Sequence, residues 1–115
     1  MKTVGSVALI AFLLTACAST DRIVLDSTKR PAKADVEVFM NGRTPEKHYK
    51  PIHEMSWHGP AQDEARAAKR FIEWAKQAGA DGLIVYRPEN KGVQWSGFGG
   101  ETKFMFKATA FVYQP

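Results

Sequence analysis

The stretch GPAQDEARAAKRFIEWAKQAGADGLIVY, residues 59–86, predicts a helix followed directly by a buried strand. Pro60 suits the first turn of a helix, where its missing N–H leaves no bond unmade. Apolar side chains then recur at helical spacing and predict a buried stripe of Ala65, Ala68, Phe71, Ile72, Ala75 and Ala78. Gly79 is a typical C-terminal stop. The continuous apolar run at residues 83–86 favours an inner strand.

Two extended segments are predicted before this helix. Residues 34–40 alternate between apolar and polar side chains, which is the period of a half-buried strand. The Asn41-Gly42 pair that follows predicts a turn. A second strand is expected over residues 49–57, where Pro51 indicates an edge or a bulge because proline cannot donate to a sheet ladder.

After the helix and inner strand, a long loop is predicted over residues 87–101 from its glycine and proline content. Residues 102–113 then alternate over the longest strand of the chain. Their small Ala108 and Ala110 offer a seat for the alanine-rich helix. The order β-β-α-β-β predicts an α+β fold, with an antiparallel or mixed sheet and one helix packed on one face.

The N-terminus carries the parts of a bacterial lipoprotein signal peptide. Lys2 supplies a positive start, and residues 4–14 supply an apolar stretch far shorter than the roughly 20 residues of a membrane span. The small Thr15-Ala16 pair precedes Cys17, as in the lipoprotein cleavage box that this motif resembles. We therefore expect residues 1–16 to be removed and Cys17 to be lipidated. The alternative is an ordinary secretory signal cut nearby, which would leave a soluble periplasmic protein.

The residues around the anchor predict its location and its reach. Ala18 favours the periplasmic face of the outer membrane, because aspartate at that position favours the inner membrane in the sorting rule that this motif resembles. Residues 17–33 are largely polar and are expected to be a lipidated N-terminus and tether. Within this segment, the apolar run Ile23-Val24-Leu25 has two alternative interpretations, an edge strand or a hydrophobic contact onto the domain. The folded domain is expected over residues 34–115.

Length, cysteine content and charge limit the classes of function. The chain has 115 residues, enough for a single small domain, and Cys17 is its one cysteine, so no intramolecular disulfide is expected. There are 16 lysines and arginines against 12 acidic residues. This excess is mild and scattered, and an exported chain seldom meets nucleic acid, so no nucleic-acid partner is expected.

Two short motifs resemble a known group of small bacterial domains. They are residues 79–84, Gly-Ala-Asp-Gly-Leu-Ile after the alanine-rich helix, and residues 107–110, Lys-Ala-Thr-Ala in the closing strand. Together they are similar to the YbjQ-like domains and to the related domain of the outer-membrane sensor lipoprotein of the Rcs stress phosphorelay. The resemblance covers roughly residues 36–113 and implies the fold. The Rcs sensor domain is held by disulfides, which this chain lacks, so stress sensing is not carried over.

The three histidines His48, His53 and His58 are weak candidates for a metal site, because imidazole is a common metal ligand. Their spacing opposes a single site. On one extended strand His48 and His58 would lie about 33 Å apart, with His53 on the other face. No metal or other cofactor is therefore expected, and loop or surface positions are the simpler interpretation.

No sequence pattern indicates an enzyme. The acidic residues of the first strand and the helix are spaced as solvated charges rather than as a convergent pair. Ser96 lacks the flanking glycines of a nucleophile elbow. The glycine-rich residues 97–100 run into a strand, whereas a phosphate-binding loop opens a helix, so a hairpin loop is expected there.

Aromatic side chains in predicted loops are the remaining functional candidates. Trp57, Trp95 and Phe98 could contact a partner, or could fold back and pack on the domain. The expected function is that of a lipid-anchored envelope lipoprotein acting as a non-catalytic binding module, for another envelope protein or for a second copy through a sheet edge. The alternative is a small metal- or ligand-binding envelope domain.

Overall fold

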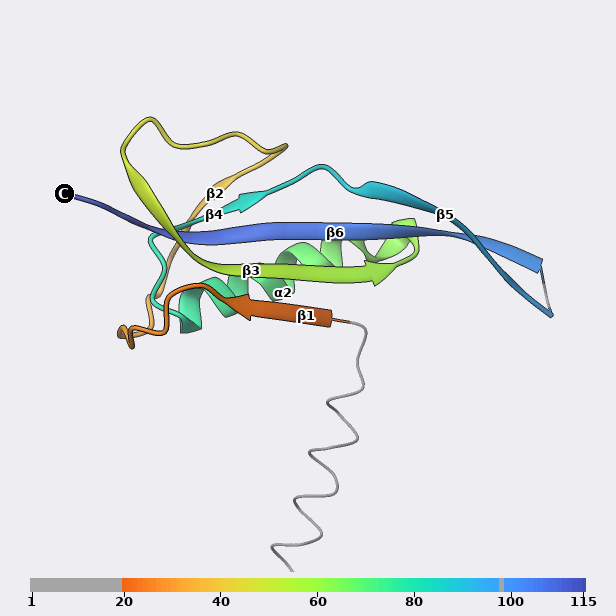
Figure 1. Cartoon of the computed structure of the whole chain (residues 1–115), viewed down its shortest axis with the longest axis horizontal. Coiled ribbons are helices and arrows are strands. Elements are labelled where there is room, and N and C mark those ends of the chain that lie inside the picture. The colour runs from red at the N-terminus through yellow and green to blue at the C-terminus, as the bar shows by residue number, and fades with distance from the viewer. Residues whose placement is uncertain (1–19, 98) are drawn as a thin grey trace, which may run out of the picture.

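A six-stranded mixed sheet with an α-helix on one face forms the part of the chain that the computed structural model describes, residues 20–97 and 99–115 (Figure 1). The elements are β1 (Thr20–Val24), β2 (Glu37–Phe39), β3 (Tyr49–Gly59), a 3-10 turn (Ala61–Asp63), α2 (Glu64–Gln77), β4 (Gly82–Val85), β5 (Glu89–Ser96) and β6 (Gly99–Tyr113). The strand order is β1-β3-β6-β4-β2, with β5 also paired to β6. The expected single α+β domain is confirmed.

Strand β6 is the central strand of the sheet and pairs along both of its edges. One of its sides pairs with β3 along residues 104–113, and the other pairs first with β5 and then with β4. These pairings are antiparallel, whereas β2 pairs with β4 in parallel. The sheet is therefore mixed, and β3 is an inner strand. A register shift lies between Pro51 and His53, so of the two alternatives predicted for Pro51, an edge or a bulge, the structure shows the bulge.

The main core lies between α2 and the sheet. Phe71, Ala67 and Ala75 are fully buried on the helix, and they face the small Ala108 and Ala110 of β6. The seat predicted for the helix is therefore confirmed. The predicted stripe is wrong at Ala65, which is exposed. The large rings of Phe71 and Trp74 face the core, and this rotation brings Ala67 inward in its place.

A second cluster, made of aromatic rings, covers the other face of the sheet. Phe111 is fully buried and packs against Phe39, Tyr49 and Tyr113 at centroid distances of 5.9, 5.0 and 5.3 Å. Its ring lies over Gly82, where an added Cβ would come within 2.3 Å of the ring. Residue 82 must therefore lack a side chain, because a Cβ there would clash with the Phe111 ring where β4 pairs with β6.

The segment expected to be a polar tether is part of the domain from Thr20 onward. Residues Thr20–Val24 form an edge strand antiparallel to β3, which resolves the alternatives left open for Ile23-Val24-Leu25. The amides of Leu25 and Asp26 both donate to the Ile52 carbonyl, and the Lys33 amide donates to that of Lys76. Ile23 is 57% exposed, so backbone pairing rather than apolar burial holds this strand.

The long loop predicted over residues 87–101 is also wrong, because most of it is strand. Residues Glu89–Ser96 pair with β6, which begins at Gly99 rather than at residue 102. The glycines that suggested a loop serve other roles. Gly92 lies at a register shift with φ 92°, and Gly99 takes φ 118° beside the turn. Both φ values favour glycine. The glycines that predicted a loop therefore lie at the register shift and beside the turn of a hairpin.

Candidate functional site

The hairpin formed by β5 and the first residues of β6, called here the arm, extends beyond the rest of the sheet (Figure 1). Strand β3 ends with Gly59 opposite Phe104. From Phe104 to Gly99 the sheet is reduced to two strands over about 17 Å, at the usual rise per residue. The arm projects at the end of the sheet where β1 begins, since Thr20 pairs with Trp57, close to the end of β3.

The arm exposes an indole on the face of the sheet that carries α2. Trp95 is paired with Gly100 and is 77% exposed, and Val93, paired with Thr102, is 51% exposed. A Cβ on Gly100 would approach the Val93 side chain within 2.6 Å and the Trp95 ring within 2.9 Å. The glycine therefore lets both side chains lie flat across the hairpin. Exposed apolar side chains of this size are typical of contact surfaces.

The other two aromatic candidates do not join Trp95. Trp57 is half-buried against the core, and its Nε1 donates to Oδ2 of Asp63 at 3.3 Å. This position matches the packing alternative for Trp57 rather than a partner-facing role. Phe98 lies outside the described residues. Trp95 is thus the predicted contact residue that the described structure exposes.

The three candidate histidines lie apart. His53 faces α2, paired with Ala110, whereas His58 is paired with Met105 and lies on the opposite face of β3. His48 is exposed before β3 begins. Within residues 20–97 and 99–115, no group of three or more histidine, cysteine, aspartate or glutamate side chains could hold a metal ion. The structure therefore does not assemble these histidines into one site.

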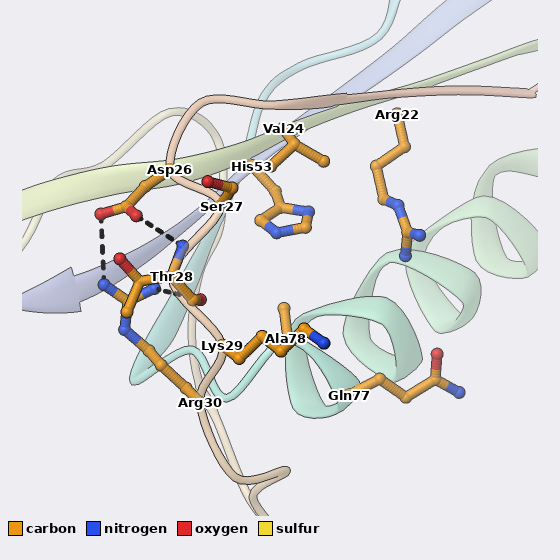
Figure 2. Close-up of a pocket in the computed structure, with 10 residues that line it drawn as sticks. All are labelled: Arg22, Val24, Asp26, Ser27, Thr28, Lys29, Arg30, His53, Gln77 and Ala78. Carbon is orange, nitrogen blue, oxygen red and sulfur yellow. Dashed lines mark hydrogen bonds and ion pairs between the residues drawn. The ribbon is translucent and has the colours of Figure 1, made fainter.

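A hollow of about 460 Å³ lies where β1, the chain after it and the end of α2 meet (Figure 2). Its lining residues are Arg22, Val24, Asp26, Ser27, Thr28, Lys29, Arg30, His53, Gln77 and Ala78. Arg22 is positioned by the Trp74 ring, whose centroid is 5.4 Å from its guanidinium carbon. The sequence did not predict this hollow, because its basic residues lie in the segment that was expected to be a tether. No local motif in that segment indicates that these residues come together in the fold.

Asp26 organises one wall of the hollow. Its Oδ2 accepts from Lys50 at 2.6 Å and from Arg30 at 3.2 Å, and its Oδ1 accepts from the Thr28 amide at 2.9 Å. The hydrogen bonds from Lys50 and Thr28 hold the pKa of this carboxyl far below its usual range. Asp26 is therefore a charged structural residue that fixes the turn after β1.

Asp81 plays a similar part at the end of α2. It accepts hydrogen bonds from the Lys33 ammonium and, at 2.7 Å, from the Tyr113 amide. Burial raises the pKa of Asp81, but these two hydrogen bonds, together with the charges of Lys33 and Arg30, outweigh it and the net pKa is lowered. A charged carboxylate with both partners in place ties together three segments of the fold. This arrangement is structural.

Comparisons with known proteins support the fold only. No family model matches the chain, and no curated protein matches it. A solved structure, a crystal structure of the Francisella virulence factor FvfA, is similar with a TM-score of 0.54 and 13% sequence identity, covering 79% of this chain and 94% of that one. At this identity the likeness extends to an α+β architecture rather than to activity.

The resemblance to YbjQ-like and Rcs-sensor-like domains stays a prediction, because no family model matches. In the part of the chain that the structure describes, no helix is long and apolar enough to cross a membrane.

Proposed function

We propose that this protein is a lipid-anchored lipoprotein of the bacterial cell envelope that binds another envelope protein through its β5–β6 arm, without catalysis. The observation that carries this proposal is the 77% exposure of Trp95 on a hairpin that extends past the folded core. Burying such an indole against a partner removes a large apolar surface from water, and tryptophan is enriched among residues that dominate binding energies.

The position of the anchor supports a role close to the membrane. Cys17 precedes Thr20 by three residues. At no more than about 3.6 Å per residue, a lipid on Cys17 would hold the start of β1 within about 11 Å of its attachment point. Because the arm projects at that same end of the sheet, it would face the membrane region (Figure 1). Ala18 continues to favour the outer membrane.

A second copy of the chain is the other candidate partner. Along the arm, β5 is paired with β6 on one side, and the β3 ladder stops opposite Phe104. Two-stranded regions offer backbone groups to an incoming strand. Another envelope protein is nevertheless the proposed partner, because an arm directed toward the anchor would reach proteins at the membrane surface.

The test is photocrosslinking in intact cells with a photoreactive amino acid at position 95. A matched probe at Lys69, on the exposed side of α2, controls for general proximity. Capture of one envelope protein at position 95 but not at position 69 would support the proposal. Capture only of a second copy, only of lipid, or of the same species at both positions would contradict it.

The anchor is tested separately with Cys17→Ser. The substitution removes the lipidated thiol, so the protein is expected to leave the membrane fraction while its thermal unfolding stays unchanged, since the core uses other residues. Fractionation and circular dichroism measure the two effects. An unchanged membrane fraction would overturn the anchor assignment without touching the arm.

A further inference from the structure

The hollow beside His53 has an excess of positive charge. Three of its lining side chains, Arg22, Lys29 and Arg30, are cationic, and Asp26 is the acidic one. Asp26 is already paired with Arg30 and with Lys50, which lies outside the hollow. Among the described residues, neither Arg22 nor Lys29 takes part in an ion pair. Two cations at this site therefore have no carboxylate partner.

A second hollow has a different balance, so a positive excess is not common to every hollow of the surface. It is lined by two lysines, Lys33 and Lys47, and three acidic residues, Asp35, Glu37 and Asp81. There the lysines and acidic side chains offset each other. A site for an anion is expected where unpaired cations converge, and the hollow beside His53 meets that condition.

His53 adds an unused hydrogen-bonding atom at the same place. Its Nδ1 is buried and has no hydrogen-bond partner among the described residues. Leaving such an atom unpaired costs free energy, and an unpaired buried polar atom calls for an explanation. Figure 2 shows the imidazole in the middle of the hollow, with Arg22 to one side, Lys29 beneath it and Arg30 turned toward Asp26. A ligand seated there would be within reach of three elements.

We infer that this hollow binds a phosphate group, with Arg22 and Lys29 supplying charge, the His53 imidazole supplying a hydrogen bond, and Val24 and Ala78 supplying an apolar floor. A phosphate suits the site better than a carboxylate. Its tetrahedral oxygens can meet donors from several directions, whereas a carboxylate is met in one plane. The hollow of about 460 Å³ leaves room for more than the phosphate alone.

The charges around His53 give the site a further property. Burial lowers the pKa of His53, and the charges of Arg22 and Arg30 lower it further, against a smaller opposing effect of Asp26. A bound phosphate would offset the two guanidinium groups and favour the imidazolium form. Because a protonated ring donates from both nitrogens, phosphate and proton should bind cooperatively.

The phosphate could belong to a soluble ligand or to a lipid headgroup, and the position of the hollow favours a soluble one. It opens beside Val24, four residues along β1 from Thr20. That distance is about 13 Å at the usual strand rise, on the side away from the proposed anchor. The two sources share the phosphate chemistry and differ in what surrounds it, so separate probes distinguish them.

The experiment uses the full chain in neutral detergent, titrated with inorganic phosphate while NMR follows the His53 imidazole. The expected result is saturable binding with a rise in the His53 pKa. Arg22→Gln and Lys29→Gln should each weaken binding about ten-fold, the usual size of one lost charge-assisted hydrogen bond. Lys69→Gln removes the same charge from the exposed face of α2 and should leave binding unchanged.

Two further measurements identify the source of the phosphate and the role of His53. Vesicles of phosphatidylglycerol and of phosphatidylcholine are compared with phosphate. Competition between phosphate and the anionic vesicles would identify a headgroup, and phosphate binding without competition would identify a soluble ligand. No His53 shift at millimolar phosphate, or an equal loss in Lys69→Gln, would overturn the site. Relative to the wild type, His53→Phe should weaken binding more at pH 6 than at pH 8 and keep the fold, which circular dichroism verifies. The vesicle comparison uses Cys17→Ser without detergent, so that no lipid anchor inserts into the vesicles, and none of these outcomes depends on Trp95.

Discussion

The two halves of strand β6 differ sharply, although they are one continuous strand. Phe106, Ala108, Ala110 and Phe111 are buried under α2 or the aromatic cluster, whereas residues 99–101, in the arm, are exposed. Both halves make the same kind of ladder hydrogen bonds. The two halves differ in what surrounds them. Among the described residues, the arm has no helix packed on its face and no third strand beside its two strands. The core half is thus built for stability, and the arm leaves its side chains available for contact.

The largest expected effect is in the core half. Phe71→Ala should lower the free energy of unfolding by about 3 to 5 kcal/mol, because it empties a fully buried site between α2 and β6. Urea denaturation of the variant and the wild type measures the difference. A loss below about 1 kcal/mol would mean that the helix does not hold the sheet as described.

A pair of glycine substitutions compares the two halves directly. Gly82→Ala would place a Cβ within 2.3 Å of the Phe111 ring, which is fully buried and cannot move aside. Overpacking of this kind costs about 1 to 3 kcal/mol. Gly100→Ala makes a similar approach to Val93 and Trp95, but both are exposed and can shift. Its cost should stay below about 1 kcal/mol. Equal losses in thermal denaturation would contradict the comparison.

Acid should weaken the core side more than the arm. The folded pKa of Asp26 lies below its unfolded value of 3.8, so its stabilisation is present above that pH and is lost as pH falls toward the folded pKa. The pKa of Glu89 in the arm is also lowered, by the hydrogen bond and charge of Lys91, but its side chain is 49% exposed against 10% for Asp26. Asp26→Asn should therefore flatten the acid dependence of unfolding more than Glu89→Gln. The reverse order would show that the ion pairs around Asp26 contribute little.

The smallest expected effect on stability is that of Trp95→Ala. Because the indole is 77% exposed, the free energy of unfolding should change by less than about 1 kcal/mol. Circular-dichroism melts measure this. A loss of several kcal/mol would mean that the ring packs on the domain and would remove the main support for a contact role.

The sequence predicted the elements whose periodicity is strong. The helix predicted between Pro60 and Gly79 is present as α2 at Glu64–Gln77, the inner strand after it and the two faces of β6 are present too, and Ala108 and Ala110 do seat the helix. The errors fall on residues 20–33 and 87–101. Both segments are largely exposed, so their side chains carry little of the apolar pattern that marks a strand. They are held by backbone hydrogen bonds, which leave no clear trace in residue type.

The candidate sites also divide into those that the sequence predicted and those that it did not. Sequence reasoning named Trp95, because a large aromatic in a glycine-rich segment stands out locally, and named Cys17 from its cleavage box. It could not group Arg22, Lys29 and His53. Arg22 and His53 are 31 positions apart in the chain and meet because β1 pairs beside β3 and α2 ends beneath them.

By itself, the sequence determined which segments bury a face, and therefore the α+β class and the helix seat. Tertiary structure alone decided that residues 20–24 form an edge strand, that β2 runs parallel to β4, and that two cations without a carboxylate partner lie beside the half-buried imidazole of His53. The physical reason is the range of the forces involved. Burial periodicity is set by neighbours in the chain, whereas strand partners and converging charges depend on segments that come together only after the chain has folded.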